Sequence, residues 1–381
     1  MIRPTVAAVD LDAIRRNCAA IRQLTGGRSG PPPGLIAVVK ANAYGHGAAE
    51  VGLALESAGA SMLACADIEE GITLRDASIR VPILVFGALS VSDLDGVFDR
   101  SLTPTISTPS AARALEAAAA RRQTTIGCHL KIDTGMNRLG FRHDNLRNTM
   151  PEVFGSRHLR IEAVYTHFAT ADDPESPFLD EQRSRFERAS AALRAMGAPA
   201  FKRHAANSAA LLRDERTWFD WVRPGLLLYG VVPPPLAAAD LPLGPALSLV
   251  SRIVAVKGLR DGEGAGYGLR FRADGPRSIA IVPAGYADGL DTRLGGRGVV
   301  LVRGKRVPIV GAVSMDMITI DVTGLDVAPG DEVVLIGPQG ADAITAREVA
   351  ATIGSIPWEV VCRLGARIHR RYAMQTLNLE L

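Results

Sequence analysis

Short apolar runs recur along the first 230 residues, and most of them are followed by a segment with helical spacing of apolar positions. The runs begin near Leu35, Met62, Ile83, Thr103, Gly127, Ile161, Lys202 and Trp221. Residues 111–122 and 179–196 are examples of the amphipathic stretches between them. Eight strand-helix units predict an α/β fold, a parallel (β/α)8 TIM-like barrel, with a doubly wound open sheet as the alternative.

The pattern changes near residue 240. Residues 233–245 contain three successive prolines, which can neither continue a helix nor donate ladder hydrogen bonds, so this segment is predicted to be a linker. Beyond it, apolar runs separated by Gly, Asp and Pro indicate a mainly-β domain with one clear helical stretch, residues 346–353. We therefore expect a barrel domain over residues 1–237 and a C-terminal β domain over residues 238–381. A strand at residues 5–10 is a candidate for pairing with the β domain.

Composition and charge narrow the class of protein. The chain has 381 residues, 47% of them hydrophobic and 22% charged, which is typical of folded globular domains. A net charge of only +3 gives no support for a nucleic-acid or membrane partner. We find neither a segment long enough to cross a bilayer nor a signal-peptide core. The four cysteines are far apart in sequence, as expected of reduced thiols in a cytoplasmic protein.

Polar residues follow the predicted barrel strands, at the face where barrels carry their reactive groups. Lys40 ends the first strand, after the apolar run LIAVV. A single strand-end lysine is more often a solvated surface residue, but desolvation lowers an ammonium pKa and leaves an amine able to form a Schiff base. The other strand ends supply Lys131, Asp133 and Arg138, then Tyr165 and His167, and finally Arg223. Taken alone, each of these residues could be a structural hydrogen-bond or ion-pair partner. Their joint placement at the ends of the predicted strands favours an active site.

The loops after the seventh and eighth strands resemble a phosphate cradle. Asn207 and Ser208 precede a short helix, for which Ser208 is the expected N-cap, and Gly225 and Leu226 offer backbone amides. Gly225 also lets the backbone approach an oxyanion closely. An embedded lysine together with a phosphate cradle indicates pyridoxal 5'-phosphate. No metal-ligand cluster has convincing spacing, so no metal is expected.

Eight segments together resemble bacterial alanine racemases of the barrel-plus-β-domain type. They are AVVKANAYGHG, KIDTGMNRLGF, YTHFATAD, AANSAA, VRPGLLLYG, GAGYGLRF, PAGYADG and GAVSMDM, in order along nearly the whole chain. The resemblance implies an isomerase that interconverts L- and D-alanine by a two-base mechanism on a pyridoxal phosphate aldimine. It also implies a biosynthetic role, in which D-alanine is supplied for peptidoglycan.

The resemblance also implies roles for individual residues. Lys40 and Tyr267 would be the two bases. The cofactor would be held by Lys40, Tyr44, His167, Asn207, Ser208, Arg223, Gly225 and Leu226. Arg138, Tyr286, Met315 and Asp316 would bind substrate. Lys131 would support Arg138 and is a candidate for carbamylation.

Two further implications concern assembly and a departure from the family pattern. The β-domain residues of this family reach the partner subunit's site, so a homodimer with shared active sites is expected.

Where the family often has a phosphate-contacting tyrosine before an arginine, this chain has Ala366 before Arg367. That role is therefore transferred neither to Ala366 nor to Tyr372.

Other functions stay open at the level of sequence. A racemase of broader specificity is one alternative, because pocket volume decides which side chains are accepted. A decarboxylase of the same architecture is a weaker one. A non-catalytic pyridoxal phosphate carrier is the alternative from another class, and the roughly 140-residue β domain weighs against it.

Overall fold

The computed structural model describes residues 3–27, 30–89, 93–238 and 241–373. By its internal contacts the chain forms two compact units. The barrel unit comprises Ile14–Ala43 and Ala48–Gly244, and the β unit comprises Met1–Ala13, Tyr44–Gly47 and Pro245–Leu381. The expected linker spans 233–245, and its residues 239–240 lie outside the described part of the chain. No helix within the described ranges is long and apolar enough to span a bilayer.

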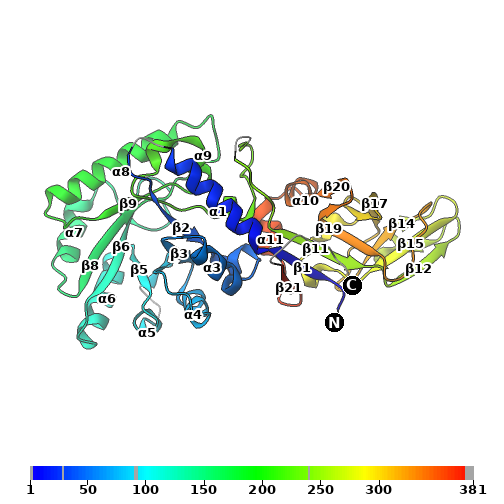
Figure 1. Cartoon of the computed structure of the whole chain (residues 1–381), viewed down its shortest axis with the longest axis horizontal. Helices are drawn as coiled ribbons and strands as arrows, with labels where there is room; N and C mark the ends of the chain where they lie inside the picture. The colour runs from blue at the N-terminus through cyan, green and yellow to red at the C-terminus, as the bar shows by residue number, and fades with distance from the viewer. Residues whose placement is uncertain (1–2, 28–29, 90–92, 239–240, 374–381) are drawn as a thin grey trace. The chain divides into compact units, whose positions relative to one another are not determined.

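The barrel unit is a closed eight-stranded parallel barrel (Figure 1). Its strands are β2 (Gly34–Val38), β3 (Met62–Cys65), β4 (Ile83–Val85), β5 (Thr103–Ile106), β6 (Ile126–Asp133), β8 (Leu159–Tyr165), β9 (Lys202–His204) and β10 (Trp221–Val222). The order β5-β4-β3-β2-β10-β9-β8-β6 is closed by pairing between β5 and β6, which excludes the open sheet. A short β7 (Phe141–Arg142) pairs with β6. Every residue of β3 and β4 is buried, as expected for parallel strands covered on both faces.

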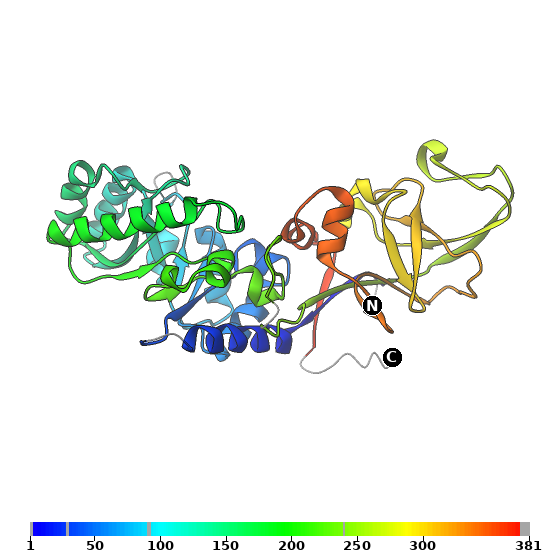
Figure 2. The same cartoon turned by 90° about the horizontal axis from the view of Figure 1, so that it is seen from above.

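Helices surround the barrel strands (Figure 2). They are α3 (Ala48–Ser57), α4 (Ile68–Asp76), α5 (Asp95–Asp99), α6 (Pro109–Arg121), α7 (Leu146–Phe154), α8 (Phe178–Ala195) and α9 (Ser208–Arg213). The start of α6 shows why its sequence is helical. Thr108 caps the helix by accepting a hydrogen bond from the Ala111 amide, and Pro109 occupies the first turn, where no amide donor is needed.

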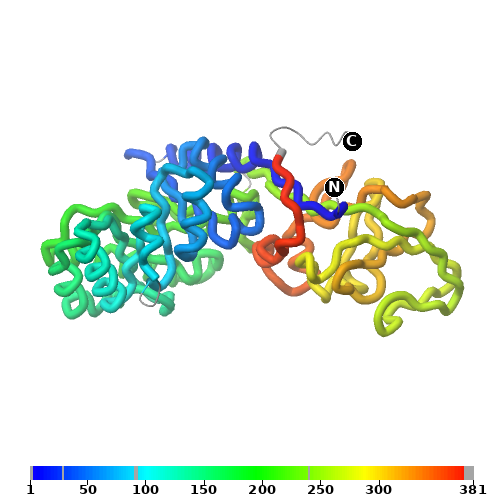
Figure 3. The backbone as a smooth tube through the Cα atoms, turned by 90° about the horizontal axis from the view of Figure 1, so that it is seen from below, coloured from blue at the N-terminus to red at the C-terminus, as the bar shows by residue number. Residues whose placement is uncertain are grey.

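The β unit contains a large, mostly antiparallel sheet. Its order is β12 (Ala255–Leu259), β15 (Arg277–Val282), β18 (Ile318–Asp321), β17 (Lys305–Val310), β16 (Val299–Val302), β19 (Glu332–Gln339), β11 (Leu247–Arg252), β1 (Val6–Asp10) and β21 (His369–Ala373). The N-terminal strand β1 is antiparallel to β11 and parallel to β21, and the blue and red segments run side by side in Figure 3. Helix α1 (Leu11–Gly26) follows β1 directly.

Smaller elements complete the β unit. β20 (Asp342–Ile344) pairs with β19, and β13 (Gly264–Ala265) forms a hairpin with β14 (Phe271–Arg272). The helix expected at residues 346–353 is α10 (Ala346–Ile353). A second helix, α11 (Pro357–Cys362), was not expected, because six residues are too few to show helical periodicity.

Candidate active site

Lys40 follows β2 and opens an unusual turn. In the short helix α2 (Lys40–Tyr44), residues Ala41 to Tyr44 all have φ of 52–53°, the left-handed region that costs L-residues roughly 1–2 kcal/mol each. Glu70 of α4 holds this turn, because its carboxylate accepts hydrogen bonds from the amides of Ala41 (2.6 Å) and Ala66 (2.7 Å). The carboxylate thereby ties the chain after β2 to the chain after β3. The Lys40 side chain is exposed at this position.

The segment after this turn belongs by its contacts to the β unit, and with it Tyr44. The Nε of Arg370 donates to the Gly45 carbonyl at 3.1 Å. A side chain at Gly45 would lie 2.1 Å from the Val361 carbonyl oxygen, and the φ there is +82°. Glycine is therefore required at this close approach.

Arg223 lies buried just beyond β10. Its Nη1 donates to Nδ1 of His204 at 2.9 Å, and its Nη2 donates to the carbonyls of Thr166 (2.7 Å) and Ala205 (3.0 Å). Burial lowers the pKa of Arg223 to about 10, so it remains a cation at neutral pH. A guanidinium with three fixed acceptors has a fixed orientation.

His167 lies beside this arginine. Arg223 Nη2 is 3.4 Å from His167 Nδ1. Burial, followed by the positive charges of Arg223 and Lys131, lowers the pKa of His167 well below its usual value. His167 is therefore neutral at physiological pH. Gln182 of α8 fixes the backbone on both sides of it, donating to the His167 carbonyl (3.1 Å) and accepting from the Ala169 amide (2.8 Å).

Lys131, on β6, is buried with 5% of its surface exposed. Its Nζ lies 5.7 Å from the centre of the Tyr165 ring. Burial, and then the charges of Arg138 and Arg223, lower the pKa of Lys131 to about 8, and Lys40 adds to this effect. Lys131 is therefore within electrostatic reach of Arg138, Arg223 and Lys40. The Asp133 carboxylate acts in the opposite direction and favours the charged form of Lys131.

Asp133 also shapes the loop that carries Arg138. Its Oδ1 accepts hydrogen bonds from the amides of Gly135 (2.9 Å) and Asn137 (3.1 Å). Such an Asx-type turn sets the path of the chain just after β6. Arg138 follows this turn and is exposed.

The loops after β9 and β10 are joined by Ser208. Asn207, and not Ser208 as expected, caps α9, because its side chain accepts from the Ala210 amide. Ser208 Oγ instead accepts from the amides of Gly225 (3.0 Å) and Leu227 (3.4 Å). Leu226 is the first residue of the 3-10 turn Leu226–Tyr229. Ser208 thus holds the loop after β10 against the start of α9.

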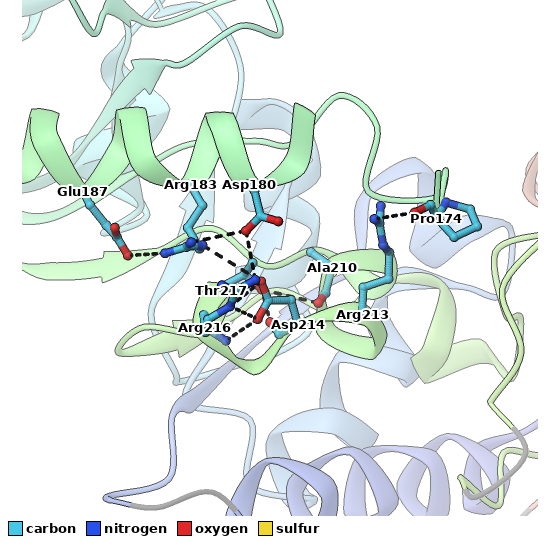
Figure 4. A network of polar contacts seen from close by, with 9 residues as sticks. All are labelled: Pro174, Asp180, Arg183, Glu187, Ala210, Arg213, Asp214, Arg216 and Thr217. Atoms are coloured by element: carbon cyan, nitrogen blue, oxygen red, sulfur yellow. Dashed lines mark hydrogen bonds and ion pairs between the residues drawn. The ribbon is translucent and has the colours of Figure 1, made fainter. Parts of the chain in front are cut away.

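An ionic network fixes the far end of α9 (Figure 4). Arg216 bonds both Asp214 (2.9 Å) and Asp180 (2.9 Å), and Arg183 bonds Asp180 at 3.2 Å. Arg213 donates to four backbone carbonyls of the loop after β8, those of Thr170, Ala171, Asp173 and Pro174. Helix α9, which begins at Ser208, is therefore held to the chain that follows His167.

The remaining predicted residues lie in the β unit. Tyr267 is 76% exposed between Gly266 and Gly268, which both have φ near +70°. Tyr286 and Met315 are exposed on adjacent loops, joined by hydrogen bonds from the Tyr286 amide to Ser314 (3.0 Å) and from the Ala287 amide to Met315 (3.1 Å). Asp316 accepts from Arg367 at 2.6 Å.

Some residues that contact the predicted site residues or their backbone were not expected from the sequence, among them Glu70, Gln182 and His204. Glu70 and Gln182 act on backbone amides and carbonyls distant in sequence, which leaves no local signal. Among the described residues, no group of three or more potential ligands could hold a metal ion.

Comparison with known proteins identifies the family. A model described as "Alanine racemase, N-terminal domain" matches residues 9–233, and one described as "Alanine racemase, C-terminal domain" matches residues 246–372. The chain belongs to the alanine racemase family. Curated alanine racemases of Symbiobacterium thermophilum and Carboxydothermus hydrogenoformans are 41% and 40% identical to it, covering 98% and 97% of this chain and 98% and 100% of theirs.

Solved structures of alanine racemases share the whole fold. The enzyme of D-cycloserine-producing Streptomyces lavendulae aligns with a TM-score of 0.93 at 34% identity, over 98% of each chain. That of Bacillus anthracis, solved with bound L-Ala-P, aligns with a TM-score of 0.91 at 36% identity, over 98% of this chain and 96% of its own. The barrel followed by a mainly-β domain is thus confirmed, and the protein is an amino-acid racemase, an isomerase.

Proposed function

We propose that this racemase interconverts L- and D-alanine with pyridoxal 5'-phosphate as cofactor. The observation that carries the proposal is the match of residues 9–233 and 246–372 to the two alanine racemase domain models, in a chain whose Lys40 follows a buried barrel strand. The charges of Arg138 and Arg223 also disfavour the ammonium of Lys131, as expected where an anionic ligand binds. A group that carries a phosphate and a phenolic oxygen supplies that charge.

The described residues fit this cofactor. Lys40 would supply the amine. Ser208 Oγ, with the backbone of Gly225 and Leu226, would contact the phosphate, and Asn207 caps the helix that begins at Ser208. Tyr44 is the further proposed phosphate contact. Arg223, held by His204 and lying beside His167, would face the ring nitrogen. When bound, pyridoxal phosphate would supply an aldehyde for amines and a ring that withdraws electrons from the substrate α-carbon.

Racemisation needs two proton carriers, because the α-proton leaves from one face of the carbon and returns to the other. We assign these roles to Lys40 Nζ and Tyr267 Oη. A permanently charged guanidinium at the ring nitrogen disfavours a proton there, which limits side reactions such as transamination. Arg138, Tyr286, Met315 and Asp316 would bind substrate, with the Arg138 guanidinium suited to its carboxylate.

We further propose a homodimer whose active sites are shared. Large apolar side chains are exposed on the β unit, namely Tyr267, Leu269, Tyr286, Met315 and Met317, with exposed fractions between 45% and 76%. Exposed aromatic and methionine side chains are typical of protein interfaces. Tyr267 would thereby act in the partner's site.

Lys131 remains a proposed carbamate. Its pKa of about 8 leaves a substantial neutral amine fraction near physiological pH, and only a neutral amine captures carbon dioxide. The resulting anion would lie among the charges of Arg138 and Arg223, where an ammonium is disfavoured.

This chain has Ala366 where the family often has a phosphate-contacting tyrosine, and the neighbouring Arg367 contacts two carboxylates. Arg367 Nη2 donates to Asp316 Oδ1 at 2.6 Å, and its Nε lies 3.7 Å from Asp288 Oδ1. We propose that Arg367 orients Asp316 for substrate, while the phosphate relies on the barrel loops. The biological role we propose is supply of D-alanine for peptidoglycan in the cytoplasm, where the thiols of the four cysteines would stay reduced.

The decisive assay is racemisation of alanine in deuterium oxide. With added pyridoxal phosphate, either enantiomer should convert to an equal mixture that carries deuterium at the α-carbon, without release of carbon dioxide. Lys40→Ala should lower kcat by at least about a thousandfold, because it removes both the cofactor amine and a base. Cofactor binding without turnover would indicate a carrier, and equal turnover of larger amino acids would indicate a racemase of broad specificity.

A further inference from the structure

Two buried histidines extend from Arg223 into the interior of the barrel. His204 Nε2 lies 3.0 Å from His129 Nδ1, and both side chains are fully buried. His129 stacks on Trp221, with ring centres 5.8 Å apart and planes 16° apart. The Nε2 of His129 is buried and has no hydrogen-bond partner among the described residues.

The proton positions along this chain follow from Arg223. A guanidinium only donates, so His204 Nδ1 must accept and carries no proton. The proton of a neutral His204 is then on Nε2, where it faces His129 Nδ1, which must accept in turn. The proton of His129 is left on its partnerless Nε2.

Burial keeps both rings neutral. It is the main cause that lowers the pKa of His129 to about 3 and that of His204 well below its usual value, and the charge of Arg223 adds to both effects. Neither ring can therefore become doubly protonated at physiological pH. The direction of the chain, from Arg223 to His204 to His129, is fixed.

We propose that His129 is a positioning residue, which accepts the Nε2 proton of His204 and so keeps His204 Nδ1 facing Arg223. Without that acceptor, the Nε2 proton of His204 would be a buried donor without a partner. Only the bond from Arg223 would then favour this ring orientation over the flipped one, in which a carbon replaces Nδ1 beside Arg223. The consequence for catalysis rests on the proposed function, in which Arg223 faces the cofactor ring.

The partnerless nitrogen supports this role. A buried donor without a partner costs about 1–3 kcal/mol, which a leucine of similar volume would avoid. The stacking on Trp221 does not explain a polar ring, because an apolar side chain would also pack there. The hydrogen bond to His204 distinguishes histidine from an apolar residue at this position.

The test compares three variants of the full-length protein. His129→Leu removes the acceptor and keeps the volume, whereas His129→Asn retains an acceptor oxygen near the place of Nδ1. Trp221→Phe is the matched control, since it alters packing on His129 and leaves the hydrogen bond in place. The readouts are the ring nitrogen shifts of His204 in protein labelled with nitrogen-15 histidine, and kcat and KM for alanine.

We expect wild-type His204 to carry its proton on Nε2 from pH 6 to 9, and His129→Leu to show a mixture of tautomers. The kcat of His129→Leu should fall about tenfold with little change in KM, a size typical of lost supporting contacts, and His129→Asn should recover most of it. Trp221→Phe should keep both the tautomer and kcat.

A proton on Nδ1 of wild-type His204 would overturn the proposal, even if His129→Leu failed to fold. So would a His129→Leu protein with wild-type tautomer and kcat. If the wild type showed the expected tautomer without racemising alanine, the proposed function would fail and the histidine chain would stand.

Discussion

At the scale of single residues, burial and neighbouring charge decide which groups are reactive. Arg223 stays charged, because its lowered pKa of about 10 is still above neutrality, whereas His167 is held neutral beside it. Lys131 falls between the two, with a pKa of about 8. Three different barrel strands and their loops therefore present a fixed cation, a neutral imidazole and an amine that titrates near physiological pH.

The lowered pKa of Lys131 predicts how stability changes with pH. Between about pH 8 and 10.5 the unfolded state binds more protons at this residue than the folded state, so its contribution to stability rises with pH. The shift from 10.5 to about 8 corresponds to about 3 kcal/mol. Lys131→Met removes this dependence.

The measurement is urea unfolding of both proteins in buffer free of carbon dioxide, at pH 7.5 and 10.5. The stability advantage of Lys131→Met over wild type should shrink by about 3 kcal/mol between the two pH values. A difference that stays constant over this range would show that Lys131 is not destabilised as an ammonium in the folded protein.

The sequence identifies Lys40, His167 and Arg223 as site candidates, because strand ends of a barrel meet at one face. It does not reveal Glu70, Gln182 or His129. Their partners are backbone groups or side chains on other strands and helices, and no spacing along the chain encodes such contacts. Ser208 shows the same limit, because its hydroxyl bonds the loop after β10 and not its own helix.

At the scale of elements, the short turn after Lys40 stores strain that the surrounding contacts must offset. Ala41 is exposed and has φ of 53°, a conformation that glycine adopts without a steric cost. Ala41→Gly should therefore stabilise the protein by up to about 1 kcal/mol, despite the larger entropy of glycine in the unfolded chain.

The control is Ala117→Gly, at an exposed position inside α6, where the backbone is ordinary right-handed helix. That change should destabilise by about 1 kcal/mol. Chemical unfolding of both variants and the wild type gives the comparison. Equal destabilisation by the two glycines would show that the left-handed turn carries no strain.

Most barrel elements could be predicted, because buried parallel strands are short apolar runs with helical segments between them. The strands begin within about one or two residues of the expected positions, from β2 at Gly34 to β10 at Trp221. Helix α11 and the break between β11 and β12 at residues 253–254 were not expected. The apolar run there continues without a glycine or proline to mark the break.

At the scale of the whole molecule, the proposed shared site predicts that two inactive chains complement each other. Lys40→Ala and Tyr267→Ala should each be nearly inactive alone. If Tyr267 acts in the partner's site, a mixed dimer has one site that lacks both residues and one that is intact. An equal mixture refolded together should regain about a quarter of wild-type activity, since half the dimers are mixed and each has one working site.

The assay is racemisation after joint refolding, with dimer formation confirmed by sedimentation. The control mixture is Lys40→Ala with Lys40→Arg, in which no dimer has an intact site. Formation of mixed dimers without recovered activity would show that each site is made within one chain.

The central claim is that the amine of Lys40 captures the cofactor aldehyde. The most direct measurement is borohydride reduction of the protein saturated with pyridoxal phosphate, followed by peptide mass mapping. We predict one reduced cofactor per chain, attached at Lys40, and none on Lys40→Ala. Attachment at Lys131 instead, or no attachment to a protein that racemises alanine, would contradict the account.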